Sequence, residues 1–583
     1  MTLTLGLNFG THDAAAAIVH NGTVVAAIEE ERLNRIKNTK AFPEHSIRAC
    51  LDLTGAHAKD LDQVALFVDP KLHLLLAPAN LRFGTVASIG SLLSDLGKYR
   101  KRRRLPGMIR RSGLLPADLP VIPVPHHRAH AASSYLVSPF EDALVVTLDG
   151  RGEYETAAVF DGIGGRLTRH HHITYPHSFG YLYSALTRYL GFRPQTDEYK
   201  VMGLAAYGDT SYSERLDRLA RFDAAAGRLR LDLRYFDHHR RPSARRTLYS
   251  PALVSLLGPP RQPGEEITDR HRDIAHALQR LLERLVGAYL GHAQSLVPRR
   301  TLCLAGGVAL NCVANATVIG SGRFDQVFIQ PAAGDAGTSV GAALSVCDPK
   351  HRVPLANAFL GPAYSDSVIE TALSKLPAGR YRVRATISPH QEAAAMLSAG
   401  NVIGWFQGRM EFGPRALGAR SILASPCSAA TAVRINAMIK QREAFRPFAP
   451  AVLAEHATGY FDLAEAGALV YPYMLATSSV RPHRRDEIPA VVHIDGSARV
   501  QTVHRDTNPD LWRLIDAFRQ QSGVPIVLNT SFNGADEPIV CTPDDAVATF
   551  VRCGLDGLVI GRFVATPSSP AASRSTGRLR KVP

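Results

Sequence analysis

The chain has 583 residues, more than one domain usually holds, and its 45% hydrophobic and 20% charged residues are ordinary for a globular protein. No apolar run approaches the ~18 residues of a membrane span, and the N-terminus lacks the basic segment of a signal peptide. Seven cysteines without a CxxC pair argue against a disulfide framework or a zinc finger, so we expect a cytoplasmic protein.

The N-terminal residues alternate strand-like runs with turns. The strand-like runs are residues 3–9, 14–20 and 23–28. An Asn-Gly pair at Asn21 is a strong signal for a two-residue hairpin. The same plan recurs over residues 143–148, 155–160 and 166–173. The sequence therefore predicts a duplicated hairpin unit.

The net charge of +15 is concentrated in a basic run at residues 98–104, followed by Arg110 and Arg111. The run lacks the repeated aromatic residues that single-strand nucleic-acid binders use, so we expect no nucleic-acid partner. A solvated helix face or loop is one interpretation of the run. The other is contact with an anionic partner, or a lid over an anionic ligand.

Two histidines, His126 and His130, lie four residues apart in the segment VPHHRAHAASSY. On a helix this spacing places both imidazoles on one face, where they can bind one metal ion. Asp149 ends an apolar, strand-like run, and Asp335 lies in a turn between a strand-like and a helix-like run. Two imidazoles and two carboxylates suit iron, manganese or zinc. The alternative is that the histidines pack in the core or cap a helix.

A third strand-like run, residues 300–304, leads into Gly306 and Gly307 and then a predicted helix from Val308 that contains Asn311. The glycines permit close backbone approach, and a helix N-terminus attracts anions. Together with the duplicated hairpins, this turn predicts an α/β protein with the two-lobed fold of actin, sugar kinases and heat-shock ATPases (ASKHA). In that fold a nucleotide lies between the lobes.

Chain breakers divide the sequence near residues 348–362, where Asp348-Pro349, Pro354 and Gly361-Pro362 occur. We expect an N-terminal domain over residues 1–352, a linker over 353–365 and a second domain over 366–565. The remaining residues, 566–583, are rich in Pro, Ser and Arg and predict a mobile tail.

The second domain gathers cations and small hydrogen-bond donors that suit phosphate. They are Arg415, Lys440, Arg446, Arg499, Asn529 and Ser531. Arginine forks bind phosphate oxygens in pairs, and lysine adds a point charge. Each segment alone also fits a surface ion pair or a turn, but their combination favours a phosphate site.

Eleven segments in order, from about residue 3 to about residue 565, resemble the O-carbamoyltransferases of antibiotic biosynthesis and nodulation. They are GLNFGTHDAAAA, EEERLNRIK, HHRAHA, LDGRGE, DEYKVMGLAAYG, AGGVALN, GDAGTSVGAA, FGPRALGARSIL, IKQREAFRPFAP, DGSARVQTV and LNTSFN. The family joins an ASKHA domain, similar to the tRNA threonylcarbamoyl-transfer protein, to a YrdC-like domain that forms carbamoyl-adenylate. Residues 70–120 resemble the family least.

The resemblance implies that carbamoyl phosphate and ATP, with Mg²⁺, form carbamoyl-adenylate in the second domain. A small-molecule hydroxyl then accepts the carbamoyl group in the first domain. The resemblance implies that Fe²⁺ is bound by His126, His130, Asp149 and Asp335, and that His12 and Lys37 lie at the acceptor side. It implies nucleotide contacts at Gly150, Gly306, Gly307 and Asn311, and carbamoyl phosphate and ATP contacts at the six phosphate-binding residues named above. His12 is the best candidate for the base that activates the hydroxyl, although it could merely line a turn.

Other classes stay open on the sequence alone. A sugar kinase would need neither the two histidines nor the arginine set. A tRNA-modifying enzyme would use threonine and bicarbonate, and a metal-binding scaffold would consume no ATP. A hydrogenase-maturation carbamoyltransferase would need zinc-finger cysteines. The acceptor is expected to be a sugar or polyketide of a secondary metabolite, and a homodimer is one possible assembly.

Overall fold

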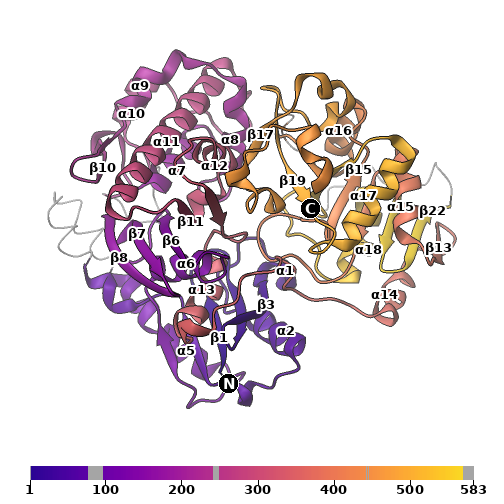
Figure 1. The fold of residues 1–583 in the computed structure, drawn as a ribbon, viewed down its shortest axis with the longest axis horizontal. Helices are drawn as coiled ribbons and strands as arrows, with labels where there is room; N and C mark the ends of the chain where they lie inside the picture. Colours follow the sequence, from indigo (N-terminus) through magenta and orange to yellow (C-terminus); the bar gives the residue numbers. More distant parts are fainter. Residues whose placement is uncertain (1, 76–95, 240–247, 441–442, 444, 569–583) are drawn as a thin grey trace. The chain divides into compact units, whose positions relative to one another are not determined.

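The computed structural model describes residues 2–75, 96–239, 248–440, 443 and 445–568, with the side chains of residues 439 and 440 excepted (Figure 1). The chain divides into two compact units. The first comprises Met1–Ala27, Lys40–Leu355 and Glu465–Leu469, and the second comprises Ile28–Thr39, Ala356–Ala464 and Val470–Pro583. The main division follows Leu355, and Ile28–Thr39 belongs to the second unit although it lies near the start of the chain.

The first sheet of the first unit has the strand order β3-β2-β1-β4-β5. Its strands are β1 (Leu3–Asn8), β2 (Ala15–His20), β3 (Thr23–Glu29), β4 (Gln63–Leu66) and β5 (Val121–Pro123). Strand β1 runs antiparallel to β2 and parallel to β4. Asn21 and Gly22 both have positive φ, 48° and 77°, which confirms the predicted hairpin turn.

The second sheet repeats this plan in the order β8-β7-β6-β11-β12. Its strands are β6 (Asp142–Leu148), β7 (Glu155–Ile163), β8 (Arg166–Thr174), β11 (Thr301–Ala305) and β12 (Gln326–Ile329). As in the first sheet, the leading strand β6 is antiparallel to its hairpin neighbour and parallel to the later strand β11. The predicted duplication is therefore confirmed at the level of strand order and direction.

Two helices of the first unit, α6 (His126–Tyr135) and α13 (Gly337–Ser345), pack against each other. Each of them also packs against strands of the two sheets. A Cβ atom on Gly341 would overlap the carbonyl oxygen of Ala129 in α6, and one on Gly6 would overlap the carbonyl oxygen of Ser339 in α13. Only glycine permits these approaches, so α13 is held tightly between α6 and β1.

The other helices and strands of the first unit surround these sheets. They are α2 (Glu44–Thr54), α5 (Leu105–Arg111), α7 (Phe179–Tyr189), α8 (Glu198–Leu204), α9 (Ser213–Asp217), α10 (Pro251–Leu257), α11 (Asp269–Leu296), α12 (Cys312–Ile319), β9 (Ala220–Asp223) and β10 (Arg228–Leu231). The helix predicted from Val308 begins later than expected. Gly307–Leu310 forms a 3-10 turn, and Asn311 is the N-cap of α12, accepting a hydrogen bond from the Ala314 N–H.

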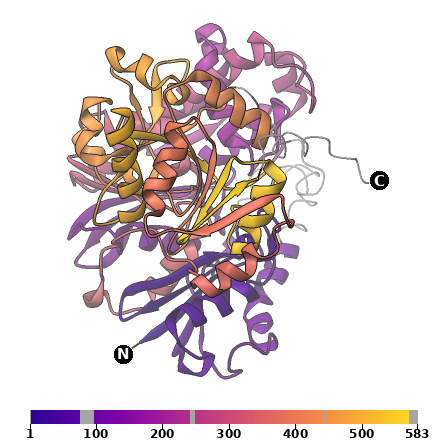
Figure 2. The same ribbon diagram turned by 90° about the vertical axis from the view of Figure 1, so that its right-hand side faces the viewer.

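The second unit is built on an eight-stranded mixed sheet, drawn in orange to yellow in Figure 2, with the order β13-β22-β21-β14-β15-β20-β16-β19. Its strands are β13 (Tyr381–Ala385), β14 (Ile403–Phe406), β15 (Arg420–Ala424), β16 (Ala449–Leu453), β19 (Gln501–Val503), β20 (Ile526–Ser531), β21 (Gly557–Ile560) and β22 (Phe563–Pro567). Strand β22 extends into the segment expected to be a tail, and residues 569–583 lie outside the described residues.

Six helices and a short two-stranded ribbon complete the described part of this unit. They are α1 (Glu30–Asn34), α14 (Asp366–Leu373), α15 (Pro389–Ser398), α16 (Ala429–Ile435), α17 (Pro509–Ser522), α18 (Pro543–Cys553), β17 (Thr477–Ser479) and β18 (Ser497–Arg499). Helix α15 packs on α17, and α14 packs on α18. Among the described residues, no helix has the length and apolar character that crossing a bilayer requires.

The packing of α6 on α13 yields a stability prediction. Gly341→Ala places a methyl group against the Ala129 backbone, so we expect the free energy of unfolding to fall by about 1–3 kcal/mol or more. The measurement is thermal unfolding followed by circular dichroism. Gly287→Ala in α11 is the matched control, because its Cβ would meet nothing within 4 Å. Equal melting of the two variants would contradict the close approach.

Candidate functional site

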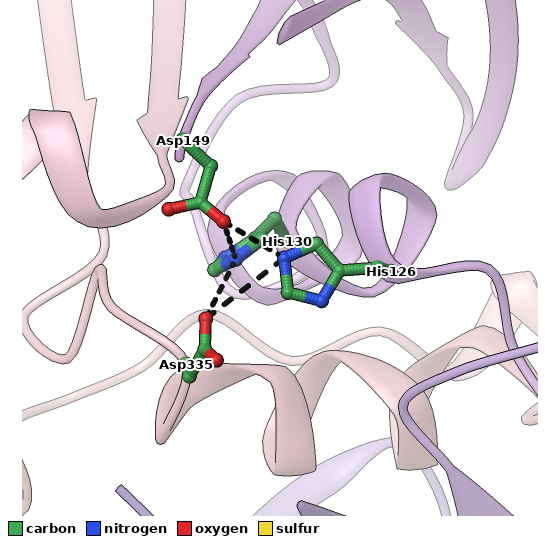
Figure 3. A group of neighbouring side chains, drawn as sticks. All are labelled: His126, His130, Asp149 and Asp335. Atoms are coloured by element: carbon green, nitrogen blue, oxygen red, sulfur yellow. Dashed lines mark hydrogen bonds and ion pairs between the residues drawn. The ribbon is translucent and has the colours of Figure 1, made fainter. Parts of the chain in front are cut away.

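The four predicted metal ligands lie together in the first unit (Figure 3). One ligand atom from each of His126, His130, Asp149 and Asp335 lies within 4.8 Å of all the others. The Nε2 atom of His126 is 3.0 Å from Asp149 Oδ2 and 3.9 Å from Asp335 Oδ1. The Nε2 atom of His130 is 3.7 Å from Asp335 Oδ1 and 4.0 Å from Asp149 Oδ2. Both imidazoles thus face both carboxylates.

Local structure explains why these side chains meet. His126 and His130 are one turn apart on α6, as their spacing predicts, and Asp149 directly follows β6. Asp335 lies just before α13, which packs on α6. Glu153, fully buried, accepts hydrogen bonds from the backbone N–H groups of His126 and Asp69. It therefore fixes the first turn of α6, a role that the sequence analysis missed although the LDGRGE segment contains it.

The electrostatics of His130, Asp149 and Asp335 favour metal-ligating protonation states. His126 differs, because its hydrogen bond with Asp149 and the charge of Asp335 outweigh burial and raise its pKa. Burial lowers the pKa of His130, and the charge of His126 adds to that effect. Burial opposes ionisation of Asp149, but its hydrogen bond with His126 and the neighbouring imidazoles outweigh burial and lower its pKa. The pKa of Asp335 is likewise lowered, because His12 and His130 outweigh burial. Ionised carboxylates and a neutral imidazole are the forms that bind metals.

The residues fit a divalent metal. Within the part of the chain that the structure describes, His130 is fully buried and no group hydrogen-bonds either of its ring nitrogens. A buried nitrogen without a partner is costly, and a metal ion among the two carboxylates would supply one. The imidazole and carboxylate donors suit iron, manganese or zinc, so the choice of iron stays a prediction.

His12 lies beside this cluster. Its Nε2 is 3.9 Å from Asp335 Oδ2, and its Nδ1 is 2.9 Å from Asp13 Oδ2. Burial alone would lower the pKa of His12, but Asp335 and Asp13 raise it to about 10. A cation bound to Asp335 would weaken the larger of these attractions. Lys37 belongs to the second unit, and its predicted role beside His12 stays a prediction.

The Gly-Gly turn supports Asp149, one of the candidate metal ligands. Gly306 has φ 96°, and a Cβ there would overlap the Leu148 carbonyl. The N–H of Gly307 donates to Asp149 Oδ1 at 3.1 Å. Asn311 exchanges two hydrogen bonds with Gln279 on α11, in addition to capping α12. These contacts are structural, and nucleotide binding by Gly150, Gly306, Gly307 and Asn311 stays a prediction.

In the second unit, the loop that carries Arg415 is anchored at both ends. The buried Glu411 accepts from the backbone N–H groups of Leu417, Ala419 and Arg420. Arg420, also fully buried, donates to several backbone carbonyls and lies over the Phe406 ring at 3.6 Å. Of the two arginines in this loop, Arg420 therefore holds the backbone, and ligand binding by the half-buried Arg415 stays a prediction.

The elements that carry the other predicted phosphate contacts adjoin this loop. Asn529 in β20 donates hydrogen bonds to the Ala416 carbonyl and to the side chain of Gln501. Gln501 is the first residue of β19 and lies two positions after Arg499. His493 contacts the Phe445 carbonyl, which ties the segment of Arg446 to the turn before Arg499. Ser531, at the end of β20, donates to Asn533. The structure thus brings these segments together, whereas the side chain of Lys440 lies outside its described part.

The sequence analysis missed a second anchor of the Arg415 loop, formed by Ile28–Thr39. Glu29 accepts from the Gly413 N–H at 2.9 Å, and Arg32 donates to the Gly413 carbonyl at 3.0 Å. Arg32 also pairs with Glu31 at 2.7 Å, and Arg35 donates to the carbonyls of Pro538 and Ile539. The segment EEERLNRIK carries these residues, and its charged side chains from Glu29 to Arg32 are buried here.

The fold and the site define an α/β protein with duplicated sheets, a buried imidazole–carboxylate cluster and a separate unit rich in ordered arginines. Sequence models of the carbamoyltransferase N-terminus match residues 4–73 and 107–344, and those of the carbamoyltransferase C-terminus match residues 394–566. The chain therefore belongs to the carbamoyltransferase family.

Several relatives align over most of the chain. Nodulation protein NolNO of Sinorhizobium fredii is 38% identical over 95% of this chain and 78% of that protein. The 3'-hydroxymethylcephem-O-carbamoyltransferase of Amycolatopsis lactamdurans is 32% identical over 75% of this chain and 79% of that protein. An uncharacterized protein of Synechocystis is 40% identical over 97% of this chain and 96% of that protein.

Two solved structures illustrate distant similarity to the chain. Component A of (R)-2-hydroxyglutaryl-CoA dehydratase from Acidaminococcus fermentans has a TM-score of 0.34 and 14% identity, covering 59% of this chain and 97% of that chain. HypF of T. kodakarensis has a TM-score of 0.29 and 14% identity, covering 59% and 48%. These TM-scores are too low to support an inference about the fold or the function.

The metal cluster yields a second prediction. Mutation of a residue that only hydrogen-bonds a metal ligand typically lowers metal affinity roughly tenfold to a hundredfold. Removal of a ligand itself, in His126→Ala or Asp149→Ala, should therefore lower metal affinity by more than about a hundredfold. Metal content of the purified variants by mass spectrometry is the measurement. His170→Ala, an exposed histidine on β8, is the control and should keep the metal. Full metal content in both site variants would show that the cluster is not the site.

The anchor at Gly413 yields a third prediction. Arg32→Ala leaves the buried Glu29 and Glu31 without their cation, a loss that costs about 3–5 kcal/mol. Hydrogen–deuterium exchange of peptides over residues 411–420 should therefore accelerate. Arg48→Ala is the control, because its pair with Glu44 is exposed and such pairs are worth about 0–1 kcal/mol. Unchanged exchange in Arg32→Ala would exclude an anchoring role.

Proposed function

We propose that this carbamoyltransferase is an ATP-dependent O-carbamoyltransferase that uses carbamoyl phosphate and works through carbamoyl-adenylate. The observation that carries the proposal is the pairing, in one chain, of a buried metal-type cluster in the first unit with an anchored arginine loop in the second. We assign the first unit to the ASKHA class on its duplicated strand order, and the second to the YrdC-like class on the sequence resemblance.

The activation step belongs to the second unit. Release of both phosphate and pyrophosphate for each adenylate consumes one water: carbamoyl phosphate gives carbamate and phosphate, and a carbamate oxygen then attacks the α-phosphorus of ATP as pyrophosphate leaves. Arg415, Arg446 and Arg499 supply cationic donors for these phosphate oxygens, and Lys440 supplies a further charge. Mg²⁺ accompanies ATP. The backbone on either side of Arg415 is held by Glu29 and Glu411, which supports a preorganised position for a cation in this loop.

The transfer step belongs to the first unit. The acceptor oxygen attacks the carbamoyl carbon, the bond to the adenylate oxygen breaks, and AMP leaves. A divalent metal held by His126, His130, Asp149 and Asp335 would polarise the carbonyl and stabilise charge on its oxygen. We assign to His12 the role of the base that takes the hydroxyl proton at Nε2, with Asp13 orienting the ring through Nδ1. This role requires the neutral ring, which a cation bound to Asp335 would favour because it offsets the largest attraction that raises the pKa of His12.

The acceptor is a small-molecule hydroxyl. One relative's name specifies transfer to a hydroxymethyl group of a cephem, and others are nodulation proteins, which supports a hydroxyl of a secondary metabolite here. A tRNA threonylcarbamoyl-type enzyme is a weaker alternative, because a single chain carrying both modules favours carbamoyl phosphate over threonine and bicarbonate. An ASKHA kinase would leave the arginine loop unexplained.

The proposal predicts pyrophosphate release that requires both ATP and carbamoyl phosphate. Arg446→Ala and Lys440→Ala should lower its rate roughly tenfold to a hundredfold, because a charge-assisted hydrogen bond is worth about 1.5–3 kcal/mol. A coupled pyrophosphate assay measures this. Arg513→Ala is the control, since Arg513 is exposed on α17. Carbamoyl-phosphate-independent release, or wild-type rates in both site variants, would refute the proposed activation step.

A further inference from the structure

His126 differs from the other candidate metal ligands because it is the first residue of a helix. The residue before it, Pro125, is the N-cap of α6 and has no side chain that could accept a hydrogen bond from the helix. A backbone N–H in the first turn of a helix finds no acceptor within that helix. The position of His126 therefore depends on groups outside α6.

The buried carboxylate of Glu153 provides the missing acceptor. Its Oε1 and Oε2 atoms lie 3.1 and 3.2 Å from the backbone nitrogen of His126. The same Oε1 accepts a hydrogen bond from the backbone N–H of Asp69 at 2.9 Å. Glu153 is 0% exposed, so bulk water does not compete for these contacts. An anionic acceptor also suits this place, because partial positive charge gathers at a helix N-terminus.

Glu153 joins three segments of the first unit. It lies in the turn after β6, four residues beyond the candidate ligand Asp149, and it binds both the turn after β4, which holds Asp69, and the start of α6. Strand β4 belongs to the first sheet and β6 to the second. One carboxylate therefore fixes the start of the helix that carries His126 relative to both sheets.

The side chain of His126 is contacted by the same two turns. The Phe67 ring, which directly follows β4 and is buried, meets the imidazole edge to face with 5.9 Å between the ring centroids. A Cβ on Gly152 would lie 2.9 Å from Cδ2 and 3.0 Å from Cβ of His126, so only glycine fits there without moving the imidazole. Both the ring and the backbone of His126 are thus held by the turns that Glu153 connects.

The first sheet contains a comparable arrangement. Asp13 is the fifth residue after β1, as Glu153 is the fifth residue after β6. The Asp13 carboxylate contacts Nδ1 of His12 at 2.9 Å. In each sheet, the turn after the leading strand therefore carries an acidic residue that contacts a histidine of the candidate site, Asp13 through the ring and Glu153 through the backbone.

We propose that Glu153 is a positioning residue for the metal: its carboxylate holds His126 in the orientation that binds the ion, and so it sets the metal affinity. The inference rests on the proposed function, because that function supplies the metal at His126. Residues that hydrogen-bond a metal ligand fix its orientation, and their loss typically lowers metal affinity about tenfold to a hundredfold. Here the contact is made to the backbone of the ligand, at the residue whose ring faces both carboxylates (Figure 3).

The experiment measures the affinity of the full-length, metal-free protein for Co²⁺ by titration, followed through the visible absorption of the bound ion. Glu153→Ala should lower the affinity roughly tenfold to a hundredfold and alter the spectrum, because His126 loses its fixed orientation. Glu153→Gln keeps one acceptor oxygen and should recover part of the affinity, which a variant that lost only charge would not.

Glu155→Gln is the matched control. It changes another buried carboxylate two residues away, which pairs with Arg169 instead of α6, so the affinity should stay within about twofold and the spectrum should not change. An equal loss of affinity in Glu155→Gln would overturn the proposal, because it would assign the effect to general destabilisation.

Wild-type affinity and spectrum in Glu153→Ala would also overturn the proposal. If Glu153→Ala fails to fold, Glu153→Gln provides the test, with a severalfold loss of affinity expected and an unchanged affinity overturning the proposal. His126→Ala tests the metal centre itself. If that variant binds Co²⁺ as the wild type does, the metal centre is refuted and this inference falls with it, whereas a wild-type response of Glu153→Ala alone refutes only the positioning role.

Discussion

The close approach of α6 and α13 is the constraint on which the metal cluster depends. Gly341 lets the backbone of α13 touch that of α6, and this places Asp335, just before α13, opposite His126 and His130. Asp149 reaches the same point from β6 and is held there by the Gly307 N–H. Two of the candidate ligands therefore lie on a helix, and the other two lie in turns at the ends of β6 and α13, so packed elements position all four.

A comparable constraint operates in the second unit at Gly413. Its N–H and its carbonyl are both bound by buried charged side chains, Glu29 and Arg32, from the start of the chain. A buried pair of this kind contributes little net stability relative to apolar packing, yet it specifies one geometry, because either partner alone would be an uncompensated buried charge. Here that geometry is the conformation of the loop that presents Arg415.

Local patterns in the sequence predicted both hairpin repeats and the pairing of His126 with His130 on one helix face, because helix and strand periodicity fix such features within a few residues. Asp149 and Asp335 lie farther along the chain, and the resemblance to the family completed the predicted set. The anchor at Gly413 could not be predicted, since Arg32 and its partner are separated by 381 positions. Nor could the inner face of the basic run, where Arg102 is half-buried and its Nη1 lies 3.4 Å from Nδ1 of His73. A helix with cations on every side has no polar periodicity from which to choose such a face. Asn311 caps a helix that was predicted to contain it, because Gly307–Leu310 forms a 3-10 turn that sequence periodicity does not distinguish from the first turn of an α-helix.

These features also bear on how the two chemistries share one chain. The boundary expected near residue 352 follows chain breakers, but Ile28–Thr39 belongs with the second unit and carries Glu29, Arg32 and Lys37. A cut at the boundary would remove these side chains from the loop around Gly413. The buried Glu411 would remain, but the Gly413 N–H and carbonyl would lose their partners. The activation chemistry proposed for the second unit therefore depends on residues encoded in the first tenth of the chain, and the covalent order of the two modules is part of how the Arg415 loop is built.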